Sequence, residues 1–134
     1  MTGTSVAPMA NSVVHFEIPA DDIDRAQAFY RDAFGWDITS MPELNYTSVS
    51  TTPTDEKGMP TEPGAINGGM FQRQAPLSTP VITIQVDDVD DALARIEKLG
   101  GKQVGEKIPV GEMGVAAYFN DSEGNLMGLW QSAR

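Results

Sequence analysis

The feature that most constrains this chain is an internal repeat. Segment 15–38 (HFEIPADDIDRAQAFYRDAFGWDI) aligns without a gap to segment 81–104 (VITIQVDDVDDALARIEKLGGKQV). Seven of the 24 aligned positions are identical: Ile18/Ile84, Asp21/Asp87, Asp22/Asp88, Asp24/Asp90, Ala26/Ala92, Ala28/Ala94 and Gly35/Gly101. Ordinary residue frequencies would give roughly one or two matches. A second match lies at the end of each half, where Gly69–Gln72 aligns with Gly128–Gln131. The sequence therefore predicts two copies of one supersecondary unit.

Each copy has the pattern of a strand, a helix and three further strands. Apolar alternation predicts strands at 13–18, 36–39, 46–51 and 66–73, and again at 81–86, 103–108, 115–119 and 126–131. Helical spacing predicts helices at 23–34 and 89–99, with Asp21 or Asp22 capping the first and glycines ending both. The segment 52–64 is rich in Pro, Thr and charge, which predicts a mobile loop. The predicted fold class is α+β, with two tandem βαβββ modules.

The length of 134 residues fits one domain. We expect a flexible N-terminal leader at 1–11 and a single domain at 12–134. Its first module covers about 12–73, a linker covers 74–79, and the second module covers about 80–132. The leader has no basic residue and no apolar core, so we do not expect a signal peptide. The chain has no membrane-length apolar run, and its lack of cysteine says little about the compartment, so a cytoplasmic protein is the default expectation.

The charge balance restricts the class of partner. Nine basic residues against 19 acidic ones give a formal net charge of −10. Such a chain repels phosphate backbones, so we expect no nucleic-acid partner, and we expect no membrane partner. The same field favours a neutral or cationic small organic ligand, although acidity also serves solubility alone.

Several motifs together resemble the vicinal oxygen chelate superfamily, the glyoxalase/bleomycin resistance protein/dioxygenase group. They are His15-Phe16-Glu17-Ile18, Phe34-Gly35-Trp36, Val86-Asp87-Asp88-Val89 and Phe119-Asn120-Asp121-Ser122-Glu123-Gly124-Asn125. The chain looks most like a glyoxalase-related bacterial subgroup. The resemblance implies a half-open, barrel-like sheet around a cavity, with the helices on the outer face. It also implies a homodimer.

Strand parity then assigns side chains to the two faces of the sheet, because successive side chains point in opposite directions. His15 and Glu17 are expected to face the cavity, while Phe16 faces the helix. Ile82, Ile84 and Val86 are expected to pack outward. The expected ligand-binding cavity is lined by His15, Glu17, Asn67, Gly69, Phe71, Thr83, Gln85, Met113, Gly128 and Trp130.

The resemblance also implies where metal ligands would lie. Metal-dependent members take one ligand from the first and one from the last strand of each module, which correspond here to His15, Gly69, Val81 and Gly128. One of these four side chains can bind a metal, and His15 is the only histidine in the chain. A Zn²⁺ site needs three or four protein ligands. We therefore expect no metal site and no cofactor, with Glu17 as the only second donor near His15.

Three roles remain open for His15 and Glu17. They could act as a catalytic pair, with the imidazole as a general base near neutral pH. They could bind a ligand by hydrogen bonds, or form a polar corner of the barrel without function. Trp130 and Phe71 could line a pocket or fill the core. Asn67 and Met113 are weaker candidates for ligand contact.

These residues leave three classes of function. The first is a glyoxalase-like small-molecule-binding protein without the divalent metal centre. The second is a lyase, isomerase or dioxygenase-type enzyme that uses His15 and Glu17. The third is a non-catalytic regulatory or interaction module. The incomplete ligand set argues against the usual form of the second class.

Overall fold

The structure, a computed structural model, describes residues 10–42, 46–56 and 59–133. Positions 1–9 of the expected leader lie outside the described residues. The elements in chain order are β1 (Val13–Ala20), α1 (Ile23–Phe34), β2 (Asp37–Met41), β3 (Tyr46–Ser50), β4 (Asn67–Gln72), β5 (Val81–Gln85), α2 (Val89–Lys98), β6 (Lys102–Val110), β7 (Gly114–Asn120) and β8 (Leu126–Ser132). These bounds agree with the predicted strands and helices to within a few residues.

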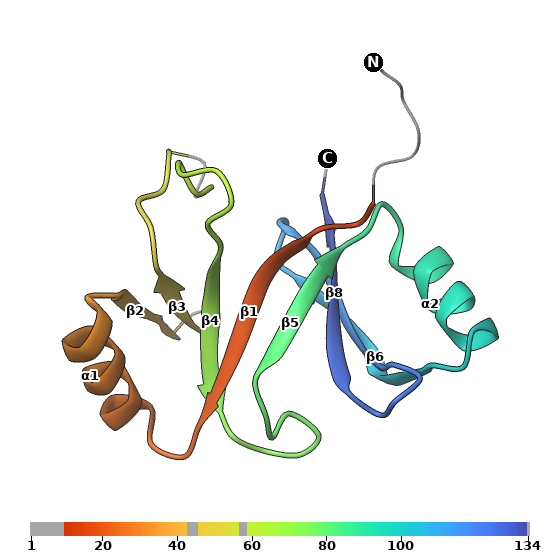
Figure 1. The fold of residues 1–134 in the computed structure, drawn as a ribbon, viewed down its shortest axis with the longest axis horizontal. Coiled ribbons are helices and arrows are strands. Elements are labelled where there is room, and N and C mark those ends of the chain that lie inside the picture. Colours follow the sequence, from red (N-terminus) through yellow and green to blue (C-terminus); the bar gives the residue numbers. More distant parts are fainter. Residues whose placement is uncertain (1–9, 43–45, 57–58, 134) are drawn as a thin grey trace.

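All eight strands form one mixed sheet in the order β2-β3-β4-β1-β5-β8-β7-β6. β1 runs parallel to β4, and β5 runs parallel to β8. The two central strands, β1 and β5, are antiparallel and join the two halves. The sheet curls but stays open, and the two helices lie at opposite flanks of the molecule (Figure 1). This arrangement belongs to the predicted α+β class.

The repeated aspartates have the same structural role in both halves. The side chain of Asp22 accepts a hydrogen bond from the backbone N–H of Arg25 at 3.0 Å and caps α1. Asp88 accepts from the N–H of Asp91 at 2.9 Å and caps α2. A short carboxylate satisfies a free N–H group and favours the helix dipole at this position. Gly35 then ends α1 in the left-handed conformation at φ 73°, which glycine adopts without strain.

The apolar core consists of two clusters, one under each helix. The first gathers Ala20, Ile38, Val49 and Met70, with Phe16 of β1 and Ile23, Ala26 and Tyr30 of α1 packed against it. The second gathers Val86, Val89, Ala92, Leu93, Ala117, Phe119 and Leu129. Because Phe16 faces α1, its neighbours His15 and Glu17 point to the opposite face of the sheet. We call that opposite face the inner face.

One expected core residue is not in the core. Ile82 was predicted to pack outward together with Ile84 and Val86. Val86 is buried and Ile84 packs against the second cluster, but Ile82 remains 45% exposed. The main sheet contacts of α2 are with β6, β7 and β8 rather than with β5. Ile82 lies opposite Phe16 and so is on the predicted outward face, but it is not packed there.

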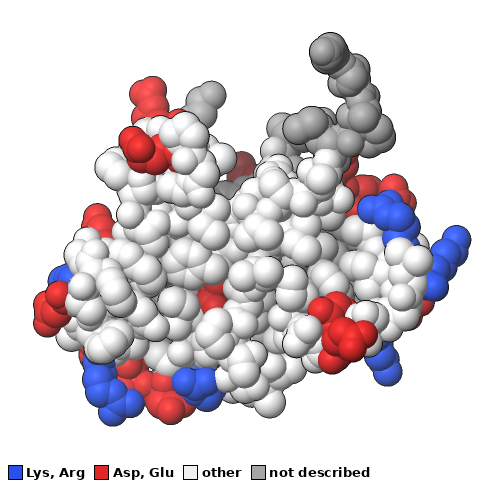
Figure 2. All heavy atoms as spheres, in the orientation of Figure 1, with Lys and Arg blue, Asp and Glu red and all other residues white. Residues whose placement is uncertain are grey.

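Charge is unevenly distributed over the surface. Figure 2 shows acidic and basic side chains at the flanks and along the lower edge, while the middle of this face is largely uncharged. Within the described residues, neither helix is long and apolar enough to cross a membrane.

Candidate functional site

Four polar side chains meet on the inner face of the sheet. The Nε2 atom of His15 lies 3.3 Å from the phenol oxygen of Tyr46. The same Nε2 lies 3.7 Å from a carboxylate oxygen of Glu17. The phenol of Tyr118 donates a hydrogen bond of 2.5 Å to the other carboxylate oxygen of Glu17. Tyr46, His15, Glu17 and Tyr118 thus form one continuous series, which we call the inner-face cluster.

The curl of the sheet makes this cluster possible. Tyr118 lies on β7, which is separated from β1 by β5 and β8. In a flat sheet, three strand spacings would place β7 roughly 14 Å from β1. Tyr118 and Glu17 are nevertheless in hydrogen-bond contact, so the sheet must curl between β1 and β7. The two residues are 101 positions apart in the sequence. Both halves of the chain therefore contribute to the cluster.

Both phenols are held in the neutral form. Burial raises the pKa of Tyr118, and the charge of Glu17 and the hydrogen bond to it raise that pKa further. Burial also raises the pKa of Tyr46, with a smaller contribution from the charge of Glu17. A neutral phenol remains a hydrogen-bond donor. The cluster consequently offers two O–H groups and one carboxylate beside an imidazole.

These shifts predict a loss of stability at high pH. A tyrosine in the unfolded chain has a pKa of about 10, whereas the folded-state pKa values of Tyr46 and Tyr118 are higher. Unfolding above pH 10 therefore releases protons, and the free energy of unfolding should fall by about 1.4 kcal/mol per pH unit for each phenol. Urea titrations between pH 9 and pH 11 measure this slope. Tyr118→Phe should remove one phenol's share of the slope, and an unchanged slope in that variant would contradict the assignment.

The structure also tests whether the residues present fit the divalent metal that the resemblance to the vicinal oxygen chelate superfamily implies. His15, Gly69, Val81 and Gly128 lie on the four adjacent central strands. A Cβ atom built on Gly69 would lie 2.0 Å from the phenol oxygen of Tyr46. A Cβ on Gly128 would lie 2.8 Å from the hydroxyl of Thr83. The space for a ligand side chain at position 69 is thus filled by a tyrosine ring.

Few side chains at this position could bind a metal ion. In the part of the chain that the structure describes, no three His, Cys, Asp or Glu side chains come together as a possible metal site. His15 and Glu17 are the two such side chains in the inner-face cluster. A closed metal site needs at least one more. The residues present do not fit the family's metal centre.

The sheet register brings part of the predicted cavity lining together. Across the inner face, His15 lies opposite Asn67 on β4 and Thr83 on β5, and Thr83 lies opposite Gly128 on β8. In the adjacent row, Glu17 lies opposite Gly69. Thr83 is buried. The oxygen of the Asn67 side chain accepts the backbone N–H of Thr51 at 2.7 Å, so this residue also anchors the connection between β3 and β4.

The other predicted lining residues lie toward the ends of their strands. Phe71 is opposite Pro19, and Gln85 is opposite Trp130. The indole N–H of Trp130 donates to the hydroxyl of Ser132 at 3.0 Å. Met113 is 58% exposed in the turn between β6 and β7. Within the described residues, no hydrogen bond or ring contact connects these side chains to His15 or Glu17.

Sequence reasoning missed Tyr46 and Tyr118. Both positions lay in predicted strands, and Tyr118 lies opposite Gly128, a predicted site residue. The short turn at 121–125 fixes the register between β7 and β8, and this register pairs Tyr118 with Gly128. The inner-face position of Tyr118 was therefore predictable from the sequence. The position of Tyr46 over Gly69 has no comparable sequence signal.

Two of the depressions that described residues form are not lined by the inner-face cluster. One, of about 490 Å³, lies between the 76–80 segment and the strands of the second half. The other, of about 320 Å³, lies between β1 and α1 and is lined in part by Arg25, Phe29 and Arg73.

Comparisons with known proteins agree with this architecture. The bleomycin resistance protein-like N-terminal family matches residues 12–52. A glyoxylase-like domain-containing protein from Didymella fabae is 33% identical over 114 residues, covering 81% of this chain and 84% of the relative. A Mycobacterium tuberculosis protein named "Putative glyoxylase CFP32" is 27% identical over 129 residues. That match covers 88% of this chain, which spans only 44% of the relative's length.

Solved structures share the fold at low sequence identity. A methylmalonyl-CoA epimerase variant from Streptomyces coelicolor superposes with a TM-score of 0.59 at 20% identity. The match covers 91% of this chain and 97% of the epimerase. The strand order, the sequence relatives and this likeness lead to one assignment: the chain belongs to the vicinal oxygen chelate superfamily of glyoxalases, bleomycin resistance proteins and dioxygenases.

Proposed function

We propose that this protein binds a small organic molecule on the inner face of its sheet, without a divalent metal. One observation carries the proposal: a tyrosine, a histidine, a glutamate and a second tyrosine are in contact at the implied metal position. Protein donors and acceptors thus replace the metal as the groups that can orient a ligand. The proposal takes the two βαβββ units as modules around one shared site, with the helices outside.

The cluster favours a ligand that carries a protonated nitrogen. One carboxylate oxygen of Glu17 accepts from Tyr118, and the other is 3.7 Å from His15, beyond hydrogen-bond distance. That second oxygen has acceptor capacity for an N–H group of a ligand. Neutral phenol rings beside a carboxylate also suit a cation through their π faces. The net charge of −10 would attract such a ligand.

The proposed binding surface extends beyond the cluster. We place Thr83, Asn67, Gly69 and Gly128 next to it, because the sheet register sets them beside His15 and Glu17. Phe71, Gln85, Met113 and Trp130 would contact only a ligand long enough to reach the strand ends. We also propose a homodimer.

A thermal-shift screen with matched variants tests the proposal. Wild type, His15→Ala and Glu17→Gln are screened against organic amines and their uncharged isosteres, and bound metal is measured by elemental analysis. Ligands that bind the folded state raise the unfolding temperature. We expect amines to stabilise wild type and to lose that effect in Glu17→Gln, which keeps the side-chain shape but removes the charge. Metal content should be far below one ion per chain.

Glu106→Gln is the matched control, since Glu106 is exposed on β6, at the far edge of the sheet. It should respond to amines as wild type does. Stoichiometric metal, or amine stabilisation that persists in Glu17→Gln, would overturn the proposal. Stabilisation by uncharged isosteres alone would retain the site but overturn the cationic ligand.

The same geometry favours one alternative, a metal-free proton-transfer enzyme of the isomerase or lyase type. The Nε2 atom of His15 lies within 4 Å of both a phenol and a carboxylate, which is the setting of a general base. Nuclear magnetic resonance in D₂O distinguishes the two functions. An enzyme would exchange a carbon-bound proton of its ligand for deuterium, and His15→Ala would stop that exchange.

A further inference from the structure

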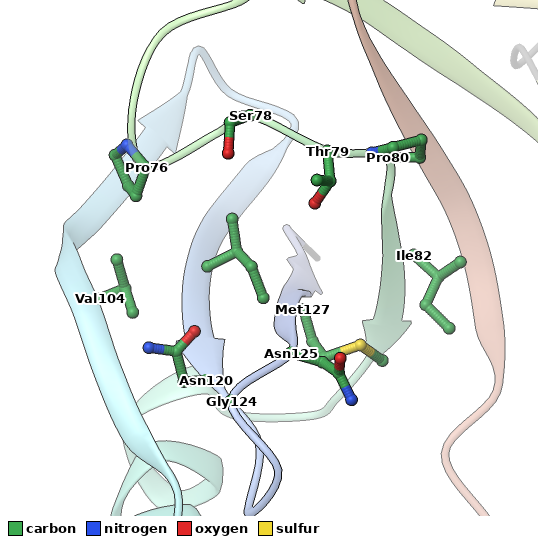
Figure 3. A pocket seen from close by; sticks show the side chains of 11 residues that line it. Pro76, Ser78, Thr79, Pro80, Ile82, Val104, Asn120, Gly124, Asn125 and Met127 are labelled. Atoms are coloured by element: carbon green, nitrogen blue, oxygen red, sulfur yellow. The ribbon is translucent and has the colours of Figure 1, made fainter.

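A groove separates the linker from the strands of the second half. Its volume is about 490 Å³, and it is lined by Pro76, Ser78, Thr79, Pro80, Ile82, Val104, Asn120, Gly124, Asn125, Leu126 and Met127. In Figure 3 the 76–80 segment arches over one side, and side chains of β5, β6, β7 and β8 line the other. We call this depression the linker groove. No residue of the inner-face cluster lines it.

Four apolar side chains form one part of the linker groove's lining, and no lining residue is charged. Ile82, Leu126 and Met127 line it from β5 and β8, and Val104 lines it from β6. No Lys, Arg, Asp or Glu is among its lining residues. Ile82 lies outside the two core clusters, is 45% exposed and lines this groove. In a chain with a net charge of −10, this depression has an uncharged lining of polar and apolar groups, and its size fits the volume range of small-molecule pockets.

Polar groups along the groove are free to bind a ligand. The side chains of Ser78, Thr79 and Asn120 make no hydrogen bond within the described residues. The amide nitrogen of Asn125 donates to Asp121 at 3.0 Å, which leaves its oxygen available. Together these groups provide hydroxyls and amides but no charge, the combination that recognises an uncharged polar group.

Both rims of the groove are held in place before any ligand binds. On the linker side, the guanidinium of Arg73 donates to the carbonyl of Ser78 at 2.5 Å, and the N–H of Leu77 donates to the carbonyl of Gln74 at 2.8 Å. On the hairpin side, the carboxylate of Asp121 accepts from the backbone N–H groups of Glu123 and Asn125. A preformed site avoids the entropy cost of ordering its walls on binding.

We propose that the linker groove is a second binding site, which takes an uncharged small molecule with an apolar body and at least one hydrogen-bonding group. It goes beyond the function proposed for the inner face, because it uses none of the same side chains. The apolar body lies on Leu126 and Ile82, and its polar group bonds to Asn120 or to the linker hydroxyls.

N-phenyl-1-naphthylamine is a suitable probe, since it is uncharged, apolar and carries one N–H donor. Its fluorescence rises when it leaves water, so a titration gives affinity and stoichiometry. We expect saturable binding of one probe per chain. Amide shifts in a nuclear magnetic resonance titration should concentrate at 76–80 and 120–127.

Two variants test the location from different directions. Thr79→Trp fills the groove from an exposed linker position, and Ile82→Asp places a charge on its floor. Each should weaken probe binding at least about tenfold, because one loses the volume and the other loses the apolar surface. Thr39→Trp, at an exposed position on β2, is the matched control and should bind as wild type does.

Glu17→Gln separates this proposal from the first one. It should leave probe binding within about twofold of wild type, whatever it does to amine binding. The proposal is overturned if the probe shows no saturable binding, if Thr79→Trp and Ile82→Asp both bind as wild type does, or if Glu17→Gln abolishes binding.

Discussion

The Gly69→Glu variant is expected to be less stable than wild type by about 2–3 kcal/mol. The Cβ atom that it adds would meet the phenol oxygen of Tyr46 at 2.0 Å and the ring carbon Cε1 at 2.4 Å. The ring would have to leave a half-buried position and its contact with His15. The added carboxylate also lies opposite Glu17 in the sheet, where like charges repel. Urea unfolding at neutral pH measures the loss.

A double-mutant cycle identifies the cause. In a Tyr46→Ala background the space is already vacant, so Gly69→Glu should cost at least about 1 kcal/mol less than in wild type. Gly69→Ala is the control for charge, since it adds the same Cβ without a carboxylate. Equal costs in both backgrounds would show that Tyr46 does not fill the position.

The same cycle bears on the metal. Only the double variant has room for a third donor beside His15 and Glu17, and three protein ligands suffice for an open Zn²⁺ site. Zn²⁺ should therefore raise the unfolding temperature of the double variant and leave wild type unchanged. A rise in wild type would contradict the poor fit between this site and a metal.

Met70→Ala and Leu129→Ala should each lower the free energy of unfolding by about 3 kcal/mol. These residues follow the two repeated glycines, and they are 1% and 2% exposed at the centres of the two core clusters. Each substitution leaves a cavity that a rigid core cannot fill. A loss of this size corresponds to a fall in Tm of about 10 °C, which calorimetry measures.

Unfolding should remain a single transition in both variants. The β1–β5 pairing joins the two halves into one continuous sheet, so neither cluster can unfold without exposing the edge of the other half. Ile108→Ala, at a 45% exposed position on β6, is the control and should cost less than about 1 kcal/mol. Two separate transitions would show that the halves are independent.

Local patterns were enough to predict most of the fold. Asp22 and Asp88 cap helices because a short carboxylate suits the first turn of any helix, whatever surrounds it. Alternation placed His15 and Glu17 on the face opposite Phe16, since strand parity does not depend on the rest of the chain. The order of strands and helices followed from the same local periods.

Features that depend on the shape of the whole sheet were not predictable from local pattern. Ile82 has an apolar side chain at an outward position, but its burial depends on how far α2 extends over β5. The contact between Tyr118 and Glu17 depends on the curl between β1 and β7. The tyrosine ring over Gly69 depends on both register and rotamer. Sequence analysis therefore found half of the inner-face cluster.

The hydrogen bond between Tyr118 and Glu17 has a consequence for how the protein matures. It joins residues 101 positions apart, so it can form only after the last two strands have been made and docked. Pairings of such long sequence separation form late in folding, because the closing of a long loop precedes any gain from the contact. A nascent or truncated chain that contains only the first half has His15, Glu17 and Tyr46 but not the donor that orients the carboxylate. The ligand binding that we propose for the inner face therefore requires Tyr118 from the second half of the chain.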